Sequence, residues 1–168
     1  RYWFFVTTGF PMAVAERGGL GGVPLRVFVY GTLKPGGRYW SAYCQGRVGR
    51  VEPARVRGAL FDLPAHGYPA MVDAAECGLT GLRAGWVFGM LLEVPGPLAV
   101  EALAGFDRLE GYVPGRASAD NEYQRRPRLV FSPGLGREAL AAWVYVMAPS
   151  LVRRLGGEWL PTGCWSAG

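Results

Sequence analysis

The sequence predicts an α+β fold, in which five strands form a sheet or a small barrel beside one main helix and short flanking helices. The chain has 168 residues, half of them apolar, which is enough for one domain with a single core. Its 26 glycines and 13 prolines are typical of short strands joined by tight turns. Only one long segment has the spacing of an amphipathic helix.

Alternating apolar residues predict the strands, which we place at residues 26–30, 54–64, 84–96, 126–131 and 139–147. The first two segments end at turns, and the turn SPGLGRE separates the last two. Glycine inside or beside a strand often marks a close approach of two backbones. We expect such approaches at Gly58, Gly67 and Gly89.

The main helix is predicted at residues 97–110. Pro97 suits the first helical position, and Gly111 provides a stop signal after the last turn. Between them, apolar residues recur near helical spacing at Leu98, Ala102, Phe106 and Leu109. Two shorter helices are expected at RYWSAYC (38–44) and PSLVRRLG (149–156).

Composition argues against a membrane or nucleic-acid partner. No apolar run reaches the roughly 18 to 20 residues that a membrane span needs. Lys and Arg exceed Asp and Glu by 18 to 13, but the arginines are scattered along the chain. The densest basic segment, QRRPRLVF, is interpreted as the entry to a strand with outward-pointing charge. A nucleic-acid adaptor remains an alternative, and it would show a steep loss of binding with salt.

The cysteines and the histidine predict neither a disulfide framework nor a metal site. Cys44, Cys77 and Cys164 are odd in number and far apart, and no CxxC pair occurs. The single histidine, His66, lies in a turn and cannot assemble a catalytic zinc site. We therefore expect reduced thiols, a cytoplasmic location and no cofactor, with carboxylate-held Mg²⁺ left open.

Residues 1–23 are interpreted as an N-terminal extension or an added segment, and residues 24–168 as the domain. The chain begins with Arg, and a short apolar run followed by AVA resembles a signal peptide. Thr7, Thr8, Gly9 and Pro11 interrupt that run, which favours an extension upstream of a natural start at Met12.

The stretch VFVYGTLKPGG (27–37) runs from a strand directly into a turn. Gly31 follows the strand by one residue, so the chain can bend there and leave the next N–H groups without partners. Such a concavity binds anions. It is not a nucleotide P-loop, because Lys34 precedes Pro35 and opens no helix. The alternative is a simple connector.

The segment FDRLEGY (106–112) places two carboxylates on one helix face, since Asp107 and Glu110 are three residues apart. Glu110 lies at the predicted helix C-terminus, where unpaired carbonyls disfavour a negative charge. Burial there would raise the pKa of Glu110 towards that of a general base. The alternative is that both acids are solvated residues at a helix end.

Several motifs occur together and in order: VYGTLKPG, VRGALFDLPAHGYPAMV, GWVFGMLLEV, FDRLEGY, EYQRRPRLV and AWVYV. Through them the sequence resembles the γ-glutamylcyclotransferase-like superfamily, particularly its small bacterial and γ-glutamylamine cyclotransferase branch. The resemblance covers residues 26–147 and extends through a tail to GCW. No single motif is specific, but the ordered set is.

The resemblance implies a mixed α/β fold built around a small β-barrel, with its pocket where the first loop meets the acidic helix end. Tyr30, Gly31, Thr32 and Leu33 match the loop that holds the substrate, and Glu110 matches the acid/base carboxylate. Tyr123 is a further pocket residue.

The activity that the resemblance implies is cofactor-independent conversion of a γ-glutamyl amine or amino-acid derivative to 5-oxoproline and free amine. Asp107 is expected to be structural and to hydrogen-bond nearby backbone. The alternative function is a small-ligand-binding protein that uses the same pocket without turnover. The oligomeric state is left open.

Overall fold

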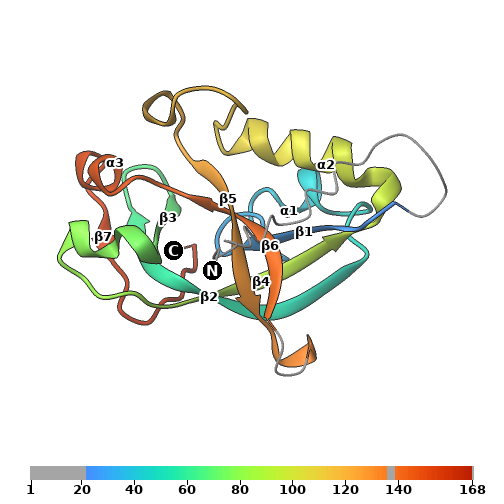
Figure 1. Ribbon diagram of the computed structural model, residues 1–168, viewed down its shortest axis with the longest axis horizontal. Coiled ribbons are helices and arrows are strands. Elements are labelled where there is room, and N and C mark those ends of the chain that lie inside the picture. The colour runs from blue at the N-terminus through green and yellow to red at the C-terminus, as the bar shows by residue number, and fades with distance from the viewer. Residues whose placement is uncertain (1–21, 136–138, 168) are drawn as a thin grey trace, which may run out of the picture.

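The structure is a computed structural model that describes residues 22–135 and 139–167 (Figure 1). Seven strands and three α-helices follow one another in these ranges. The strands are β1 (Leu25–Val29), β2 (Arg50–Leu63), β3 (Tyr68–Asp73), β4 (Gly85–Val94), β5 (Gln124–Phe131), β6 (Ala139–Val146) and β7 (Glu158–Trp159). The α-helices are α1 (Trp40–Tyr43), α2 (Gly96–Leu109) and α3 (Pro149–Arg154), and three 3₁₀ turns lie at Ala74–Thr80, Ser118–Asp120 and Pro133–Leu135.

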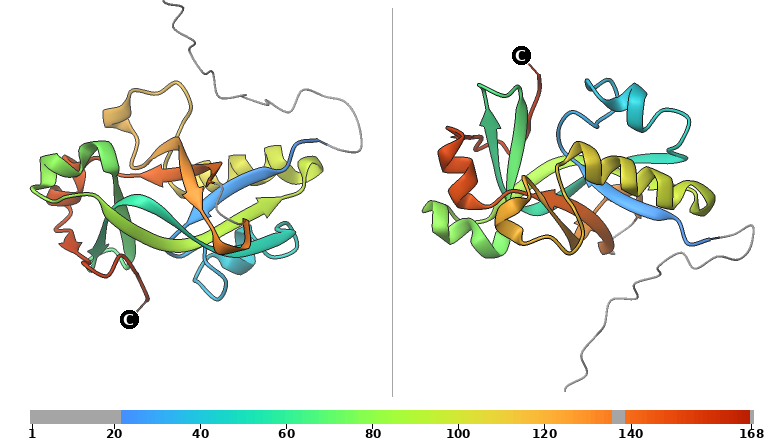
Figure 2. Two further views of the ribbon diagram at one scale, coloured as in Figure 1. Left: turned by 60° about the horizontal axis from the view of Figure 1, so that its bottom comes forward. Right: turned by 90° about the horizontal axis from the view of Figure 1, so that it is seen from above.

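Five strands close into a barrel in the order β2-β4-β1-β6-β5. The closing contact joins β5 back to β2, where Phe131 pairs with Arg55. All neighbours in the barrel are antiparallel except β1 and β6, which run parallel. The predicted fold class, α+β with a small barrel and one main helix, is confirmed. Strands β3 and β7 extend the sheet at the far end of β2 (Figure 2).

Strand β1 lies between two hydrophobic cores, because its side chains point alternately to one core and to the other. Phe28 points into the barrel interior, and Tyr30, just past the end of the strand, points the same way. Val27 and Val29 point to the opposite face, where helix α2 packs and Phe106 is fully buried. Figure 2 shows α2 lying beside β1. The end of β1 therefore lies between the barrel and the helix.

Helix α2 begins one residue earlier than predicted, so Pro97 occupies the second helical position instead of the first. Both positions lie in the first turn, where proline removes no hydrogen bond that the helix would make. The helix ends at Leu109, Glu110 is its C-cap, and Gly111 takes a φ of +61°. The two short helices α1 and α3 lie inside the predicted ranges.

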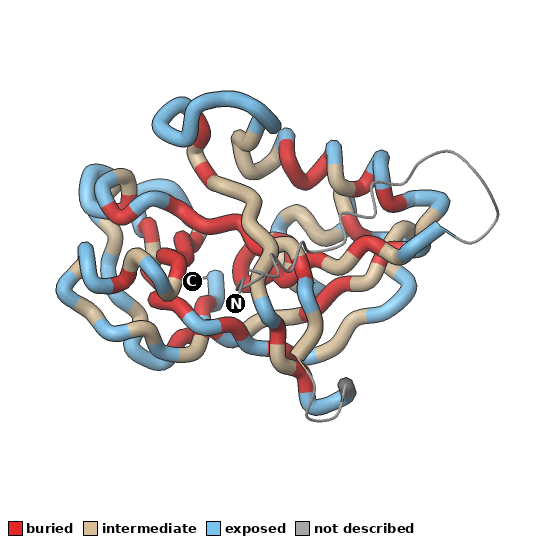
Figure 3. The backbone as a smooth tube through the Cα atoms, in the orientation of Figure 1, coloured by how far each residue is buried: buried red, intermediate tan, exposed pale blue. Residues whose placement is uncertain are grey.

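Strand β3 was not predicted from the sequence. Five of its six residues are buried, so it carries no alternation between apolar and polar side chains. The exposed turn between β2 and β3 contains His66 (Figure 3). Gly58 and Gly89 lie against neighbouring backbone as expected, but the expectation for Gly67 is wrong. Nothing lies within 4 Å of a Cβ built on Gly67, whose φ is +71°.

The expected N-terminal extension lies outside the described residues, apart from its last two positions. Among the described helices, none is long and apolar enough to cross a membrane. Within the same residues, no three His, Cys, Asp or Glu side chains gather closely enough to hold a metal ion. Cys44 and Cys77 are buried and Cys164 is exposed. Burial raises the pKa of the Cys44 thiol to about 12, which makes it unreactive near neutral pH.

Candidate active site

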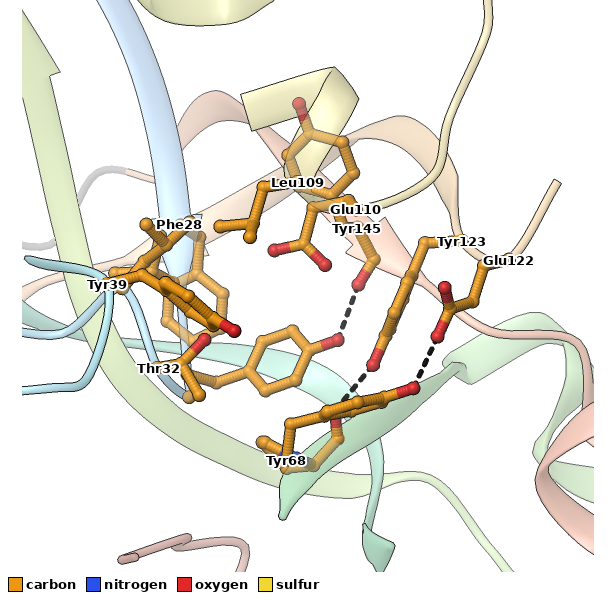
Figure 4. Close-up of a pocket in the computed structure, with 14 residues that line it drawn as sticks. Phe28, Thr32, Tyr39, Tyr68, Leu109, Glu110, Glu122, Tyr123 and Tyr145 are labelled. Atoms are coloured by element: carbon orange, nitrogen blue, oxygen red, sulfur yellow. Dashed lines mark hydrogen bonds between the residues drawn. The ribbon is translucent and has the colours of Figure 1, made fainter. Parts of the chain in front are cut away.

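A cavity of about 130 Å³ lies where the loop after β1 meets the C-terminal end of α2 (Figure 4). The loop residues 30–33, Glu110 and Tyr123 all line it, although they come from three distant parts of the chain. Every residue predicted from the sequence for the pocket is thus at one place. Their roles in binding or catalysis stay predictions.

Glu110 points its carboxylate into this cavity from the end of α2 (Figure 4). The Glu110 N–H closes the last helical turn by donating to the Phe106 carbonyl at 2.9 Å. Burial, and then the negative charge of Glu122, raise the pKa of Glu110 from 4.5 to about 8. No side chain in the described ranges donates a hydrogen bond to this carboxylate, so its oxygens remain available to a ligand.

Gly111 and the residues after it explain why Glu122 and Tyr123 lie beside Glu110. The chain leaves the helix at Gly111, makes an excursion over residues 112–121, and then returns. On its return, Glu122 N–H donates to the Gly111 carbonyl at 3.2 Å, and Tyr123 N–H donates to the Glu110 carbonyl at 3.3 Å. Two backbone hydrogen bonds therefore hold Glu122 on the wall of the cavity that Glu110 also lines.

The loop after β1 lines the cavity with residues 30–33. It is folded by hydrogen bonds from Lys34 N–H to the Gly31 carbonyl at 3.1 Å and from Tyr39 N–H to the Thr32 carbonyl at 3.0 Å. In the described part of the chain, the N–H groups of Gly31, Thr32 and Leu33 find no acceptor. These unpaired N–H groups are compatible with the predicted donor site, and its role in binding stays a prediction.

Lys34 belongs to the same loop but does not line the cavity. Its Nζ donates to the Trp165 carbonyl at 2.6 Å, and the Trp165 indole donates to Asp62 Oδ1 at 2.7 Å. Trp165 is buried against the barrel core. The C-terminal segment thereby anchors the loop to the barrel.

Five tyrosines line the cavity, and the hydroxyls of four of them, Tyr30, Tyr68, Tyr123 and Tyr145, donate hydrogen bonds. Tyr30 donates to the Tyr145 carbonyl at 2.7 Å, and Tyr123 donates to the Pro69 carbonyl at 2.8 Å. Tyr68 donates to Glu122 Oε1 at 2.5 Å. Burial raises the pKa of Tyr30, Tyr68, Tyr123 and Tyr145 above the ordinary value of 10.0, so all four are neutral at physiological pH.

Asp107 is buried and structural, but its partners differ from those expected. It accepts hydrogen bonds from two side chains, the Tyr145 hydroxyl at 2.7 Å and Arg125 Nη1 at 2.6 Å, instead of from backbone. The Arg125 guanidinium also lies over the rings of Tyr112 and Trp143, at 5.1 and 4.8 Å. This network ties the last turn of α2 to strands β5 and β6.

The expectation of outward-pointing charge in QRRPRLVF is wrong. Arg125 pairs with Asp107, while Arg126 and Arg128 both pair with the buried Asp73. Burial alone would raise the pKa of Asp73, but the hydrogen bonds and charges of the two arginines lower it. These arginines serve the fold, because buried carboxylates need such partners.

Sequence reasoning missed part of the cavity wall, namely Tyr39, Tyr68, Glu122 and Tyr145. Glu122 stands directly before the predicted Tyr123, which was the available signal. Glu122 lines the same cavity as Glu110 because the backbone of residues 122 and 123 hydrogen-bonds to that of residues 111 and 110. No local sequence pattern indicates these hydrogen bonds. Tyr68 begins strand β3, which was not predicted because its buried residues show no alternation.

The fold and the cavity define a barrel protein with a carboxylate at a helix end, facing a loop of free amides. The chain belongs to the family described as γ-glutamyl cyclotransferase, AIG2-like, whose model matches residues 27–167. The superfamily predicted from the motifs is confirmed. No curated protein sequence matches the chain.

Solved structures share this fold at low sequence identity. YkqA from Bacillus subtilis is 22% identical with a TM-score of 0.53, over 85% of this chain and 40% of that protein. A protein from Arabidopsis thaliana known from a solution structure is 23% identical with a TM-score of 0.55, over 81% and 76%. A mouse AIG2-like protein is 18% identical with a TM-score of 0.54, over 85% and 88%.

Proposed function

We propose that the protein is a cyclotransferase that converts a γ-glutamyl amine or amino-acid derivative to 5-oxoproline and free amine. The observation that carries the proposal is the shared cavity of Glu110 and the free amides of residues 31–33. A γ-glutamyl compound contains both reactants, so the protein needs to supply only geometry and proton transfer. Membership of the family supports this reaction class.

The reaction joins two parts of one molecule. The α-amine attacks the γ-carbonyl, a new C–N bond closes a five-membered lactam, and the bond to the leaving nitrogen breaks. A small cavity favours the folded conformation in which these atoms meet, and confinement of this kind contributes up to about 7 to 11 kcal/mol in well-oriented systems. The tyrosine walls, held by hydrogen bonds, make the cavity rigid.

Glu110 would act as the base and then as the acid. An α-ammonium group has a pKa of about 8, and burial with the charge of Glu122 raises the pKa of Glu110 to about 8. Because the two values match, the ionised carboxylate can take the proton and return it to the leaving nitrogen. The negative charge on the attacked carbonyl oxygen needs donors that are already in place. The amides of residues 31–33 provide them, or hold the substrate carboxylate.

The test is a screen of γ-glutamyl compounds for release of 5-oxoproline, followed by Glu110→Gln. The amide has nearly the shape of the carboxylate but cannot accept the proton, so kcat should fall by at least about 10²-fold. Glu101→Gln, on the exposed face of the same helix, is the matched control and should retain full turnover. If the Glu110 variant keeps turnover within a few fold, Glu110 is not the base. If the wild type binds 5-oxoproline but turns over no γ-glutamyl compound, the protein is a binding protein. The cytoplasmic location and the lack of a cofactor stay predictions.

A further inference from the structure

The cavity contains a second carboxylate that the reaction does not require. Glu122 lines the same space as Glu110 and is held there by the backbone pairing of residues 122 and 123 with 111 and 110. A single base would suffice for proton transfer during ring closure. The presence of two acids in a cavity of about 130 Å³ therefore calls for its own explanation.

Tyr68 fixes the Glu122 side chain. Its hydroxyl donates to Glu122 Oε1 at 2.5 Å, across 54 positions of sequence. Tyr68 begins strand β3 and lies with its ring 6.5 Å from that of Tyr123 (Figure 4). The bond connects the β2–β3 hairpin to the returning segment, so Glu122 is restrained from both sides. Glu122 Oε1 accepts this hydrogen bond, which holds the carboxylate against the cavity wall.

Apart from Glu122, the other titratable groups of the lining are tyrosines. They are Tyr30 after β1, Tyr39 before α1, Tyr68 from β3, Tyr123 before β5 and Tyr145 from β6. The lining contains no Lys, Arg or His side chain. Arg125 is engaged by Asp107 and does not line the cavity. Glu122 is thus the one other charged side chain that the described lining offers to Glu110.

We propose that Glu122, fixed by Tyr68, is a positioning residue whose carboxylate on the wall of the shared cavity favours the protonated form of Glu110 in the resting protein. Ionising Glu110 would place a second negative charge in the same small cavity. Such pairs release their protons in two separated steps. Glu110 therefore retains its proton up to about pH 8, where burial and the Glu122 charge place its pKa.

A direct test is the titration of the Glu110 side-chain carboxyl carbon by NMR in protein labelled with [δ-¹³C]glutamate, without substrate. The wild-type midpoint should lie near pH 8. In Glu122→Gln it should fall by roughly one pH unit, because the neighbouring charge is gone. Glu122→Asp retains the charge and should keep the midpoint above that of the Gln variant. Glu101→Gln, on the outer face of α2, should leave it unchanged.

An unchanged midpoint in Glu122→Gln would overturn the proposal and leave burial as the sole cause. Tyr68→Phe tests the other half: release of the Glu122 side chain should lower the Glu110 midpoint part of the way. If Tyr68→Phe titrates like the wild type, Tyr68 does not fix the pair.

The consequence for turnover rests on the proposed function. The acidic limb of the kcat/KM profile reports the base in the free enzyme, so Glu122→Gln should shift this limb to lower pH by the same amount as the NMR midpoint. A limb that stays in place while the midpoint moves would overturn the link to catalysis. If no γ-glutamyl compound is turned over, the proposed function fails, yet the titration still decides the inference.

Discussion

Gly31→Ala tests whether the loop amides need their exact position. A Cβ built on Gly31 lies 2.7 Å from Pro69 Cγ and 2.8 Å from Pro69 Cδ. Carbon atoms in contact are normally about 3.5 to 4.0 Å apart, so one side must move by about 1 Å. Pro69 cannot give way easily, because its ring is rigid and its strand pairs with β2 opposite Asp62. We expect the loop to move.

Gly31→Ala should lower both the stability of the fold and the rate of turnover. Overpacking of this kind destabilises by about 1 to 3 kcal/mol, which corresponds to roughly 2 to 4 °C in Tm per kcal/mol for a domain of this size. A shift of about 1 Å in a catalytic group costs on the order of 10²-fold in rate. At 20 °C, Gly31→Ala should therefore reduce kcat/KM by a large factor while most of the protein stays folded. Gly31→Val, with two further methyl groups, should lose more of both.

The assay is 5-oxoproline release at 20 °C, together with thermal unfolding of the same samples to show that both proteins are folded at that temperature. Gly78→Ala is the matched control, since no heavy atom lies within 4 Å of its Cβ position. It should keep the wild-type Tm and kcat. A Gly31→Ala protein with wild-type kcat and KM would show that the loop is only a connector and would refute the reasoning.

Two further predictions concern stability. Burial and Glu122 raise the pKa of Glu110 to about 8 in the folded protein, from an ordinary value of 4.5. The contribution of Glu110 to the free energy of unfolding is therefore fully present below about pH 4.5 and is lost as the pH rises through 8. Glu110→Gln has no carboxyl group to titrate, so its free energy of unfolding, measured in urea, should fall less between pH 5 and 9 than that of the wild type. Equal losses in the two proteins would contradict this prediction. Asp107→Asn leaves the Arg125 guanidinium, whose side chain is 13% exposed, without its anion, and should cost about 3 to 5 kcal/mol. Glu101→Gln, which breaks an exposed pair with Arg47, should cost about 0 to 1 kcal/mol; similar losses in the two variants would refute the distinction.

Local patterns predicted the parts of the fold that are locally encoded. β1 alternates because its two faces meet different cores, and α2 shows helical spacing because one face covers Phe106 and its neighbours. The closure of the barrel through Arg55 and Phe131 joins residues too far apart for any periodicity to indicate. Strand β3 escaped because burial on both faces removes alternation. The family resemblance supplied the barrel, which the patterns left open.

The candidate site divides in the same way. Gly31 and Glu110 carry local signals, a glycine after a strand and an acid at a helix end. Tyr68 and Glu122 have none, because their place in the cavity comes from a hairpin and from the return of a loop. The arginines of QRRPRLVF were misjudged for a related reason. Their buried partners, Asp73 and Asp107, lie far away in sequence, so the segment looked like solvated charge.

Gly111 links the end of the helix to the assembly of the site. Its φ of +61° lies in the left-handed region, which lets the chain leave α2 immediately after Glu110. A Cβ at this position would lie 3.1 Å from Glu122 Cβ, tighter than ordinary contact. A side chain there would therefore strain the turn and press against Glu122 at once. The same residue that stops the helix also leaves room for Glu122, so the sequence Leu109-Glu110-Gly111 places one carboxylate on the cavity wall and leaves space for the second.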